Sequence, residues 1–503
     1  METTLVVIPD DALADALRRL PARGLAGARC VCKAWHGIVD DRGLLLPHLL
    51  PHSVRGIFIN YIDHRRPHLF ARPSSAASPK IDAMLSFLPK NDDRRDWWSV
   101  MDHCDGLLVF GIKWHSRLCV GNPATRRWTL LPERTERLAG YAGAHLMFEP
   151  ATSPHYEVIL IPAVPKKPRR PLSWKVKKKK KCLPPRQHEI DGPFCLQLLF
   201  SSLDDTLLSD EGTQDHGEEE FQPATESAGP VQPCVDEDED KEPDDLYRLM
   251  EWPPSPCQLN VFSSRTGQWE AKSFIRDGDP VGTVEDVRSD LSKQWLGTRH
   301  RSSTVYQNRT LYVHCGGSFI MRLSLSNDKY QVINTPQKIG NEKPYLGRLE
   351  KDVCFGFFDE GQLQVWILKE SHEKIEWVLR YQNDLSSYAR YASSLYNNAE
   401  TPSEESLEWN SDNDDIISVG GEENRGEEFC YILGFHAYKK IVFLADPFGV
   451  VAYHMDKSKA QYLGNSRPNC YYHNYSNGIY ESFVYTPCMI GALQEDNTDT
   501  STS

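Results

Sequence analysis

Helical periodicity is confined to the first fifty residues of the chain. Four apolar side chains share one face of a predicted helix: Leu13, Ala16, Leu17 and Leu20. Pro9 suits the start of this helix, and Pro21 ends it. Two more short helices are expected over about 25–32 and 35–39. Such short helices bury little on their own, so residues 5–47 are predicted to form a small all-α module with apolar surface left for a partner.

From residue 54 onward the pattern changes to short alternating strands separated by turn residues. One motif repeats, namely an apolar strand, a polar turn and a second strand that opens on an aromatic residue. The motif recurs at 118–131, 259–274, 319–332, 363–381 and 450–463, with the aromatic anchors Trp128, Trp269, Tyr330, Trp377 and Tyr462. Further hairpins are expected over 56–71 and 145–162.

The spacing of the anchors predicts the architecture. Without the charged segments described next, successive anchors stand roughly 40–60 residues apart, which suits four-stranded propeller blades. We therefore predict that the all-α module is followed by an all-β domain, a β-propeller of about six blades. A pair of two-sheet β-sandwiches is the alternative that this repeat leaves open.

Three segments carry most of the charge. Residues 204–245 hold 17 acids and one base, residues 400–428 hold 11 acids and one base, and residues 166–186 hold 11 bases and no acid. The net charge of the whole chain is −13, so the rest of it is nearly neutral. The acidic segments have few apolar side chains and are predicted to be disordered.

These patterns set the predicted boundaries. The β domain occupies 54–165, 251–383 and 429–492. It is interrupted by a basic and then acidic disordered insertion over 166–250 and by an acidic one over 398–428, and it is followed by a disordered tail over 493–503.

The basic segment contains a run of lysines. They are Lys175, Lys177, Lys178, Lys179, Lys180 and Lys181. Such a run is typical of a nuclear-import signal, of a solvated loop or of a nucleic-acid patch. Single-strand binding also uses aromatic side chains between the charges, and Trp174 alone offers one, so nucleic acid is the least favoured partner.

Composition and cysteine usage favour an intracellular protein. No apolar run approaches the ~18 residues of a membrane helix, and no basic stretch precedes the first apolar residues, so neither a membrane span nor a secretory signal is expected. The 13 cysteines include no Cys-x-x-Cys pair, which favours reduced thiols in the cytoplasm or the nucleus. Cys30 and Cys32 are expected on one helix, pointing apart, so no metal or other cofactor is predicted.

Segments 8–13, 17–21 and 29–35 resemble the F-box in order and spacing. The resemblance implies docking onto the Skp-family adaptor of a cullin–RING ubiquitin ligase. The implied docking residues are Pro9, Leu13, Leu17, Leu20, Pro21, Leu25, Val31 and Trp35. Ala12 and Ala16 are smaller than the family pattern, and Gly24 and Gly27 weaken the second helix, so weakened docking is expected.

The β region also resembles a known family. Segments 104–108, 122–128, 150–162, 261–267 and 432–436 are similar to the F-box-associated repeat region of plant F-box proteins, especially those of grasses. This resemblance implies a substrate receptor that captures a target protein for ubiquitination and has no catalytic activity. It does not identify the target.

Two other functions remain open at this point. One is a propeller scaffold whose degenerate F-box no longer docks. The other is a propeller hydrolase, for which the pairs His314–Cys315 and Cys470–His473 would be the candidates, although packing roles are expected for both. The chain has no nucleophile elbow, Walker loop or His-Glu-x-x-His motif, so the hydrolase is the less favoured of the two.

Overall fold

The computed structural model describes most of the predicted helical module and β domain. The described residues are 9–51, 53–62, 64–71, 81, 85–89, 97–112, 117–133, 141–167, 247–292, 303–314, 316–339, 344–359, 361–371, 374–385, 431–446, 448–468, 471, 478–490 and 493. The predicted insertion over 398–428, the lysine run and nearly all of the predicted insertion over 166–250 and of the tail lie outside these residues.

The N-terminal module consists of short helices. They are α1 (Asp10–Arg18), α2 (Ala22–Arg29), α3 (Lys33–Asp41) and α4 (Leu46–Leu49). Pro9 and Pro21 stand immediately before α1 and α2, where a missing N–H costs nothing. Cys30 ends α2 and Cys32 precedes α3, so the prediction that both cysteines lie on one helix is wrong. The interruption arises because α2 stops at Arg29 and the chain turns before α3 begins.

Three of the sheets each contain four strands in chain order. One sheet contains β3 (Trp98–Cys104), β4 (Leu107–Ile112), β5 (Arg117–Asn122) and β6 (Arg127–Leu130). Another contains β17 (Tyr345–Leu349), β18 (Asp352–Asp359), β19 (Gln362–Glu370) and β20 (Ile375–Asp384). A third contains β21 (Tyr431–Phe435), β22 (Ile441–Asp446), β23 (Gly449–His454) and β24 (Lys459–Asn465).

An eight-stranded sheet combines two antiparallel groups of four. The first group is β7 (Tyr141–Phe148), β8 (Tyr156–Pro162), β10 (Cys257–Ser263) and β11 (Gln268–Arg276). The second is β13 (Ser303–Gln307), β14 (Thr310–His314), β15 (Phe319–Ser324) and β16 (Lys329–Asn334). A short parallel pairing of β11 with β16 joins them. The remaining described elements here are β9 (Glu251–Trp252), β12 (Gly282–Thr283) and α6 (Val284–Ser292).

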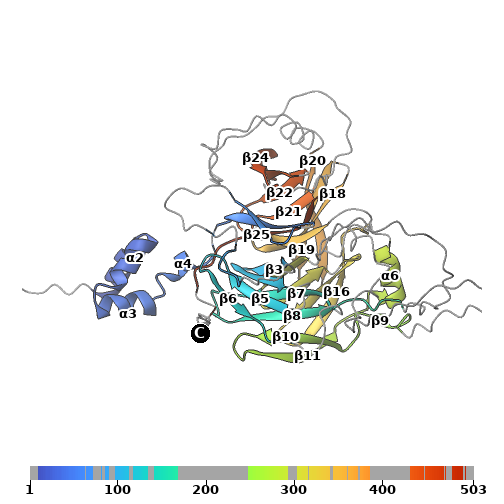
Figure 1. Ribbon diagram of the computed structural model, residues 1–503, viewed down its shortest axis with the longest axis horizontal. Coiled ribbons are helices and arrows are strands. Elements are labelled where there is room, and N and C mark those ends of the chain that lie inside the picture. The colour runs from blue at the N-terminus through green and yellow to red at the C-terminus, as the bar shows by residue number, and fades with distance from the viewer. Residues whose placement is uncertain are drawn as a thin grey trace, which may run out of the picture.

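The two ends of the β domain meet in one sheet. Strand β1 (Gly56–Tyr61) lies between β2 (His68–Phe70) and β25 (Ile479–Tyr485), and Gly56 faces Tyr485 across the β1–β25 ladder. An N-terminal strand is therefore held by a C-terminal one, which ties the ends of the domain together (Figure 1).

Apolar clusters fill the spaces between neighbouring groups of strands. One cluster lies between the β1–β2–β25 sheet and β3–β6. The next lies between β3–β6 and strands β7, β8 and β10 of the eight-stranded sheet. Further clusters join the two halves of that sheet, then β13–β16 with β17–β20, β17–β20 with β21–β24, and β21–β24 with the first sheet. In the described part of the chain, these clusters close a ring.

The repeated hairpin predicted from the sequence is confirmed at all five places. It is formed by the last two strands of each group of four, which are β5–β6, β10–β11, β15–β16, β19–β20 and β23–β24. Each aromatic anchor lies on the outer strand; Trp128, for example, faces Gly121 and Tyr330 faces Leu323. The hairpins predicted over 56–71 and 145–162 are also present.

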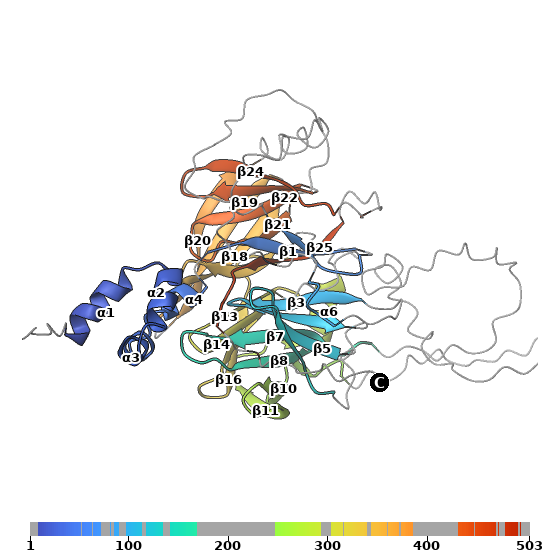
Figure 2. The same cartoon turned by 60° about the vertical axis from the view of Figure 1, so that its left-hand side comes forward.

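In each group of four the first strand lies at the centre of the ring, and β25 takes this place in the sheet of β1, β2 and β25. Arg348 at the end of β17 contacts Asp105 just after β3, and Gly434 in β21 lies against Val484 in β25, so these central strands end on the same face. The helical module joins that face, because Gly56 pairs with the end of β25 (Figures 1 and 2). No helix in the described ranges has the length and apolarity needed to cross a membrane.

Candidate functional site

The helical module has a small core that fixes its shape. Leu17, Leu25, Ala28, Val39 and Leu44 are buried together. Two ion pairs support this packing. Arg29 of α2 pairs with Asp40 of α3 at 2.6 Å, and Arg42 after α3 pairs with Asp11 of α1 at 2.6 Å. The three longer helices are therefore held to one another by both apolar and ionic contacts.

The structure divides the predicted docking residues into three classes. Leu17 and Leu25 are buried in the core of the module. Leu13, Leu20 and Trp35 are half-buried at the edge of that core, and Pro9, Pro21 and Val31 are exposed. The role of this set in docking stays a prediction.

Val31 is the most exposed large apolar side chain among the described residues of the module, with 64% of its surface accessible. It lies in the short turn between α2 and α3, where its amide donates to the Ala28 carbonyl oxygen. Leu46 at the start of α4 is also exposed, and the sequence patterns did not single it out. Exposed apolar side chains on so small a module mark a surface that a partner can cover.

A second candidate site lies along the centre of the strand ring. Three cavities follow one another there and share lining residues: His103, Thr304 and Tyr345 line the first two, and Asp105, Tyr306 and Arg348 line the last two. The last cavity is the largest, at about 260 Å³, and it lies on the face to which the helical module is joined.

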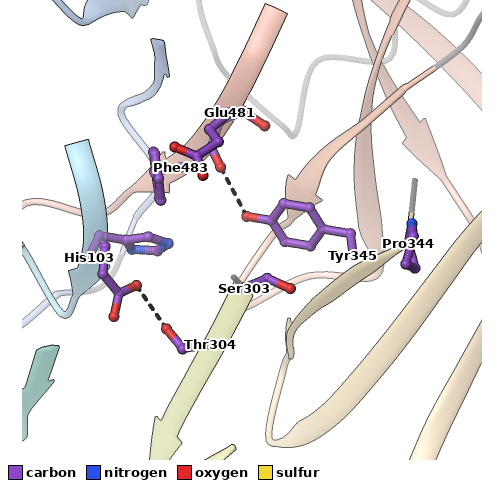
Figure 3. Close-up of a pocket in the computed structure, with 9 residues that line it drawn as sticks. His103, Ser303, Thr304, Pro344, Tyr345, Glu481 and Phe483 are labelled. Carbon is purple, nitrogen blue, oxygen red and sulfur yellow. Dashed lines mark hydrogen bonds between the residues drawn. The ribbon is translucent and has the colours of Figure 1, made fainter. Parts of the chain in front are cut away.

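Buried polar contacts hold the inner end of this passage (Figure 3). The Thr304 hydroxyl and the Leu146 amide both donate to the carboxylate of Asp102, each at 2.8 Å. Asp102 thereby ties β3 to β7 and β13. The Tyr345 hydroxyl donates to the Ser482 carbonyl oxygen at 3.2 Å, which ties β17 to β25.

Charged side chains line the wider end. Arg348 forms an ion pair with Asp105 at 3.3 Å, and its guanidinium lies 6.0 Å from the centre of the Tyr438 ring. Burial raises the pKa of the Asp105 carboxyl, even though Arg348 opposes that shift. Burial also raises the pKa of Tyr438 to about 12 and lowers the pKa of His103, so both are neutral near pH 7.

Of the residues considered for catalysis, His314 alone lies in the described part of the chain. His314 Nε2 lies 2.9 Å from the Gly317 carbonyl oxygen, and its ring packs edge-on against Phe355. Its predicted partner Cys315, and the pair Cys470 and His473, lie outside the described residues. Burial raises the pKa of the Cys104 and Cys354 thiols, which disfavours the reactive thiolate. The described ranges contain no group of three or more His, Cys, Asp or Glu side chains that could hold a metal ion.

Comparison with known proteins agrees with the helical module. Residues 6–46 match the F-box domain.

Several proteins of Arabidopsis thaliana are similar to part of the chain. A putative F-box protein is 27% identical over 125 residues, which cover 25% of this chain and 33% of the relative. An F-box protein is 27% identical over 123 residues, covering 24% and 30%, and another putative F-box protein is 30% identical over 128 residues, covering 25% and 41%. The chain thus spans about a third of the length of the first relatives it matches.

These findings confirm the coarser part of the sequence interpretation. The protein has a small helical F-box followed by a mostly β domain, and it is similar to plant F-box proteins. The F-box match covers most of the range predicted for the helical module.

Proposed function

We propose that this protein is the substrate receptor of a Skp-adaptor–cullin–F-box ubiquitin ligase and is not itself catalytic. The F-box would bind the Skp-family adaptor, and the β domain would bind a target protein. The observation that carries the proposal is the F-box match over residues 6–46, on a folded module that leaves Val31 exposed.

We propose further that the β domain is a six-bladed propeller. Its support is the ring of apolar clusters, in which each group of strands packs on two neighbours, and the pairing of β1 with β25. Pairing first and last strands is a common way for a ring of sheets to protect its ends. The sandwich alternative has no comparable support, because two packed sheets do not require a closed ring of contacts.

The target would bind at the face opposite the F-box. Lys167 and Tyr247 lie near the two ends of the first predicted insertion, and Leu385 and Tyr431 lie on either side of the second. Each of the four follows or precedes a strand end on that face. Loops supported by a rigid scaffold are the usual place for partner contacts. We propose that the lysine run within the first insertion directs nuclear import and that the protein works in the cytoplasm, the nucleus or both.

Binding to a purified plant Skp-family adaptor tests the proposal. We expect the full chain to retain the adaptor on beads. Val31→Asp should bind the adaptor at least about tenfold more weakly, because a charge would enter an apolar contact. Leu249→Asp is the matched control, because Leu249 is 79% exposed and lies just before β9, outside the helical module. Equal retention by both variants, or no retention by the wild type, would leave the scaffold with a degenerate F-box as the better account.

A further inference from the structure

The segment between the F-box and the β domain is fastened at several points. It runs from the end of α4 at Leu49 to the start of β1 at Gly56. The Met489 amide donates to the Leu49 carbonyl oxygen at 2.8 Å, and the Arg55 amide donates to the Tyr485 carbonyl oxygen at 2.9 Å. Val54 is buried in the cluster beneath β1 and β25. A free linker of this length would allow many orientations of the F-box, whereas this one is held at Leu49, Val54 and Arg55.

A side chain from a distant strand turn completes the attachment. Tyr438, between β21 and β22, donates its hydroxyl hydrogen to the Pro51 carbonyl oxygen at 2.8 Å. The Tyr438 amide donates to His436 Nδ1 at 3.1 Å, and the His436 ring stacks on Phe443 with an interplanar angle of 27°. Tyr438 is therefore anchored at its backbone as well as at its hydroxyl.

The same tyrosine lies beside Arg348, which lines two of the central cavities. The guanidinium of Arg348 faces the Tyr438 ring, and Arg348 is held by Asp105 in the wall of the 260 Å³ cavity. A continuous series of contacts thus runs from the cavity through Arg348 and Tyr438 to Pro51. Asp105 follows β3, Arg348 lies in β17 and Tyr438 lies between β21 and β22, so the residues in contact are far apart in sequence.

We infer that Tyr438 is a latch, a side chain that fixes the orientation of the F-box relative to the strand ring. We also infer that Arg348 holds Tyr438 in place from the side of the 260 Å³ cavity. In a receptor, such a latch sets the distance and angle between the adaptor and a bound target. The inference concerns contacts within this chain, so it does not depend on the adaptor binding proposed above.

Hydrogen–deuterium exchange on the full chain without adaptor tests the latch. In Tyr438→Phe the ring remains but Pro51 loses its donor. We expect the amides of Met489, Leu49, Leu50, Ser53, Val54 and Arg55 to exchange about fivefold faster, as the loss of one hydrogen bond in a local opening predicts. Arg348→Gln is expected to accelerate exchange in the same two segments, because the Tyr438 ring loses its cation.

Tyr471→Phe is the matched control. Its hydroxyl also donates to a backbone carbonyl oxygen, that of Ile62, at 2.8 Å, but away from the linker. The inference predicts no change in the linker or at Met489 for this variant. Unchanged exchange in Tyr438→Phe, or an equal increase in Tyr471→Phe, would overturn the latch. Faster exchange in Tyr438→Phe with no change in Arg348→Gln would overturn the role of Arg348.

Discussion

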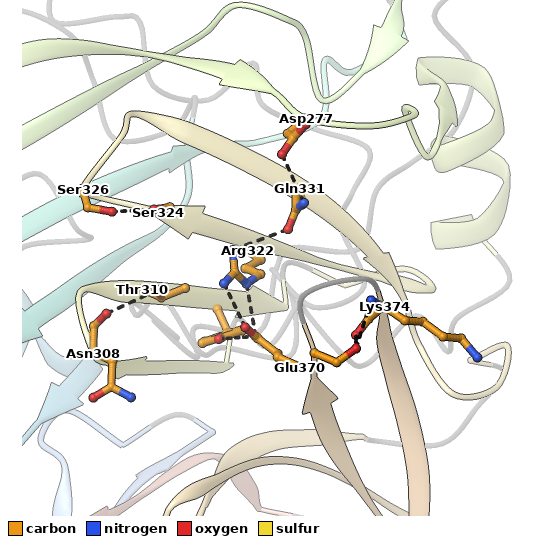
Figure 4. Close-up of polar contacts among 11 residues, drawn as sticks. Asp277, Asn308, Thr310, Arg322, Ser324, Ser326, Gln331, Glu370 and Lys374 are labelled. Carbon is orange, nitrogen blue, oxygen red and sulfur yellow. Dashed lines mark hydrogen bonds and ion pairs between the residues drawn. The ribbon is translucent and has the colours of Figure 1, made fainter.

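Glu370 shows how single side chains join neighbouring groups of strands (Figure 4). Its carboxylate accepts two hydrogen bonds from Arg322, at 2.8 and 3.1 Å, and one from the Tyr312 hydroxyl. This arrangement ties β14 and β15 to β19. Glu370→Gln should lower the free energy of unfolding by about 1–3 kcal/mol, because the half-buried Arg322 loses its charged partner. Denaturant unfolding measures the change.

Glu376→Gln is the control for this prediction. Glu376 pairs with Lys374 close by, but the two side chains are 49% and 70% exposed, so water already screens the pair. Its loss should change the free energy of unfolding by at most about 0.5 kcal/mol. Equal effects in the two variants would show that the Glu370 contacts do not stabilise the junction.

Glu370 also predicts a pH dependence. Burial alone would raise the pKa of its carboxyl, but hydrogen bonds from Arg322 and Tyr312 outweigh burial and lower the pKa below the ordinary 4.5. A carboxyl whose pKa is lower in the folded state adds stability above the unfolded pKa, and that stability is lost as the pH falls through the folded pKa. The gap between wild type and Glu370→Gln should therefore narrow below about pH 4.5. A gap that stays constant down to pH 3 would contradict this.

Leu17 marks the limit of sequence reasoning at this scale. The helical spacing correctly predicted an apolar stripe of Leu13, Leu17 and Leu20, but Ala16, predicted on the same face, is exposed. Yet a side chain that faces the core of its own module and one that faces a partner have the same pattern. The structure separates them, since Leu17 is buried and Val31 is exposed. Val31→Asp therefore tests docking, whereas Leu17→Asp would disrupt the module itself.

At the scale of elements, two glycines weaken α2 of the F-box. Gly27 lies inside this helix, and a Cβ placed there would meet nothing within 4 Å. Gly27→Ala should stabilise the helix by up to about 1 kcal/mol, because alanine loses less backbone freedom on folding. Slower amide exchange over residues 22–29 would report the gain. No change, or faster exchange, would show that α2 is not limited by its glycine.

The hairpins were predictable and the links between groups were not. A strand–turn–strand motif depends on neighbouring residues, so its alternation and turn residues are visible in the sequence. The parallel pairing of β11 with β16 joins segments that are far apart in sequence, and it consists of two residue pairs. No local sequence pattern predicts such a pairing. The pairing of β1 with β25 is likewise set by ring closure rather than by either strand alone.

On the scale of the whole molecule, the sequence predicted the order of parts better than their contacts. The helical module, the β domain and the charged segments follow from periodicity and composition. Arg348 and Asp105 are 243 residues apart and meet only when the ring closes. The central cavities and the latch could therefore not be predicted from the sequence. The Asp105-Gly106 turn was the single local signal near this site, because both residues have positive φ angles that suit a tight hairpin.

The central claim is that the F-box connects this β domain to a ubiquitin ligase through an adaptor. The most direct measurement mixes the purified chain, a plant Skp-family adaptor and the adaptor-binding part of a plant cullin, and determines masses by size-exclusion chromatography with light scattering. The account predicts a complex with one copy of each protein, which does not form when the adaptor is left out. A chain that elutes alone, or that binds the cullin without the adaptor, would contradict it.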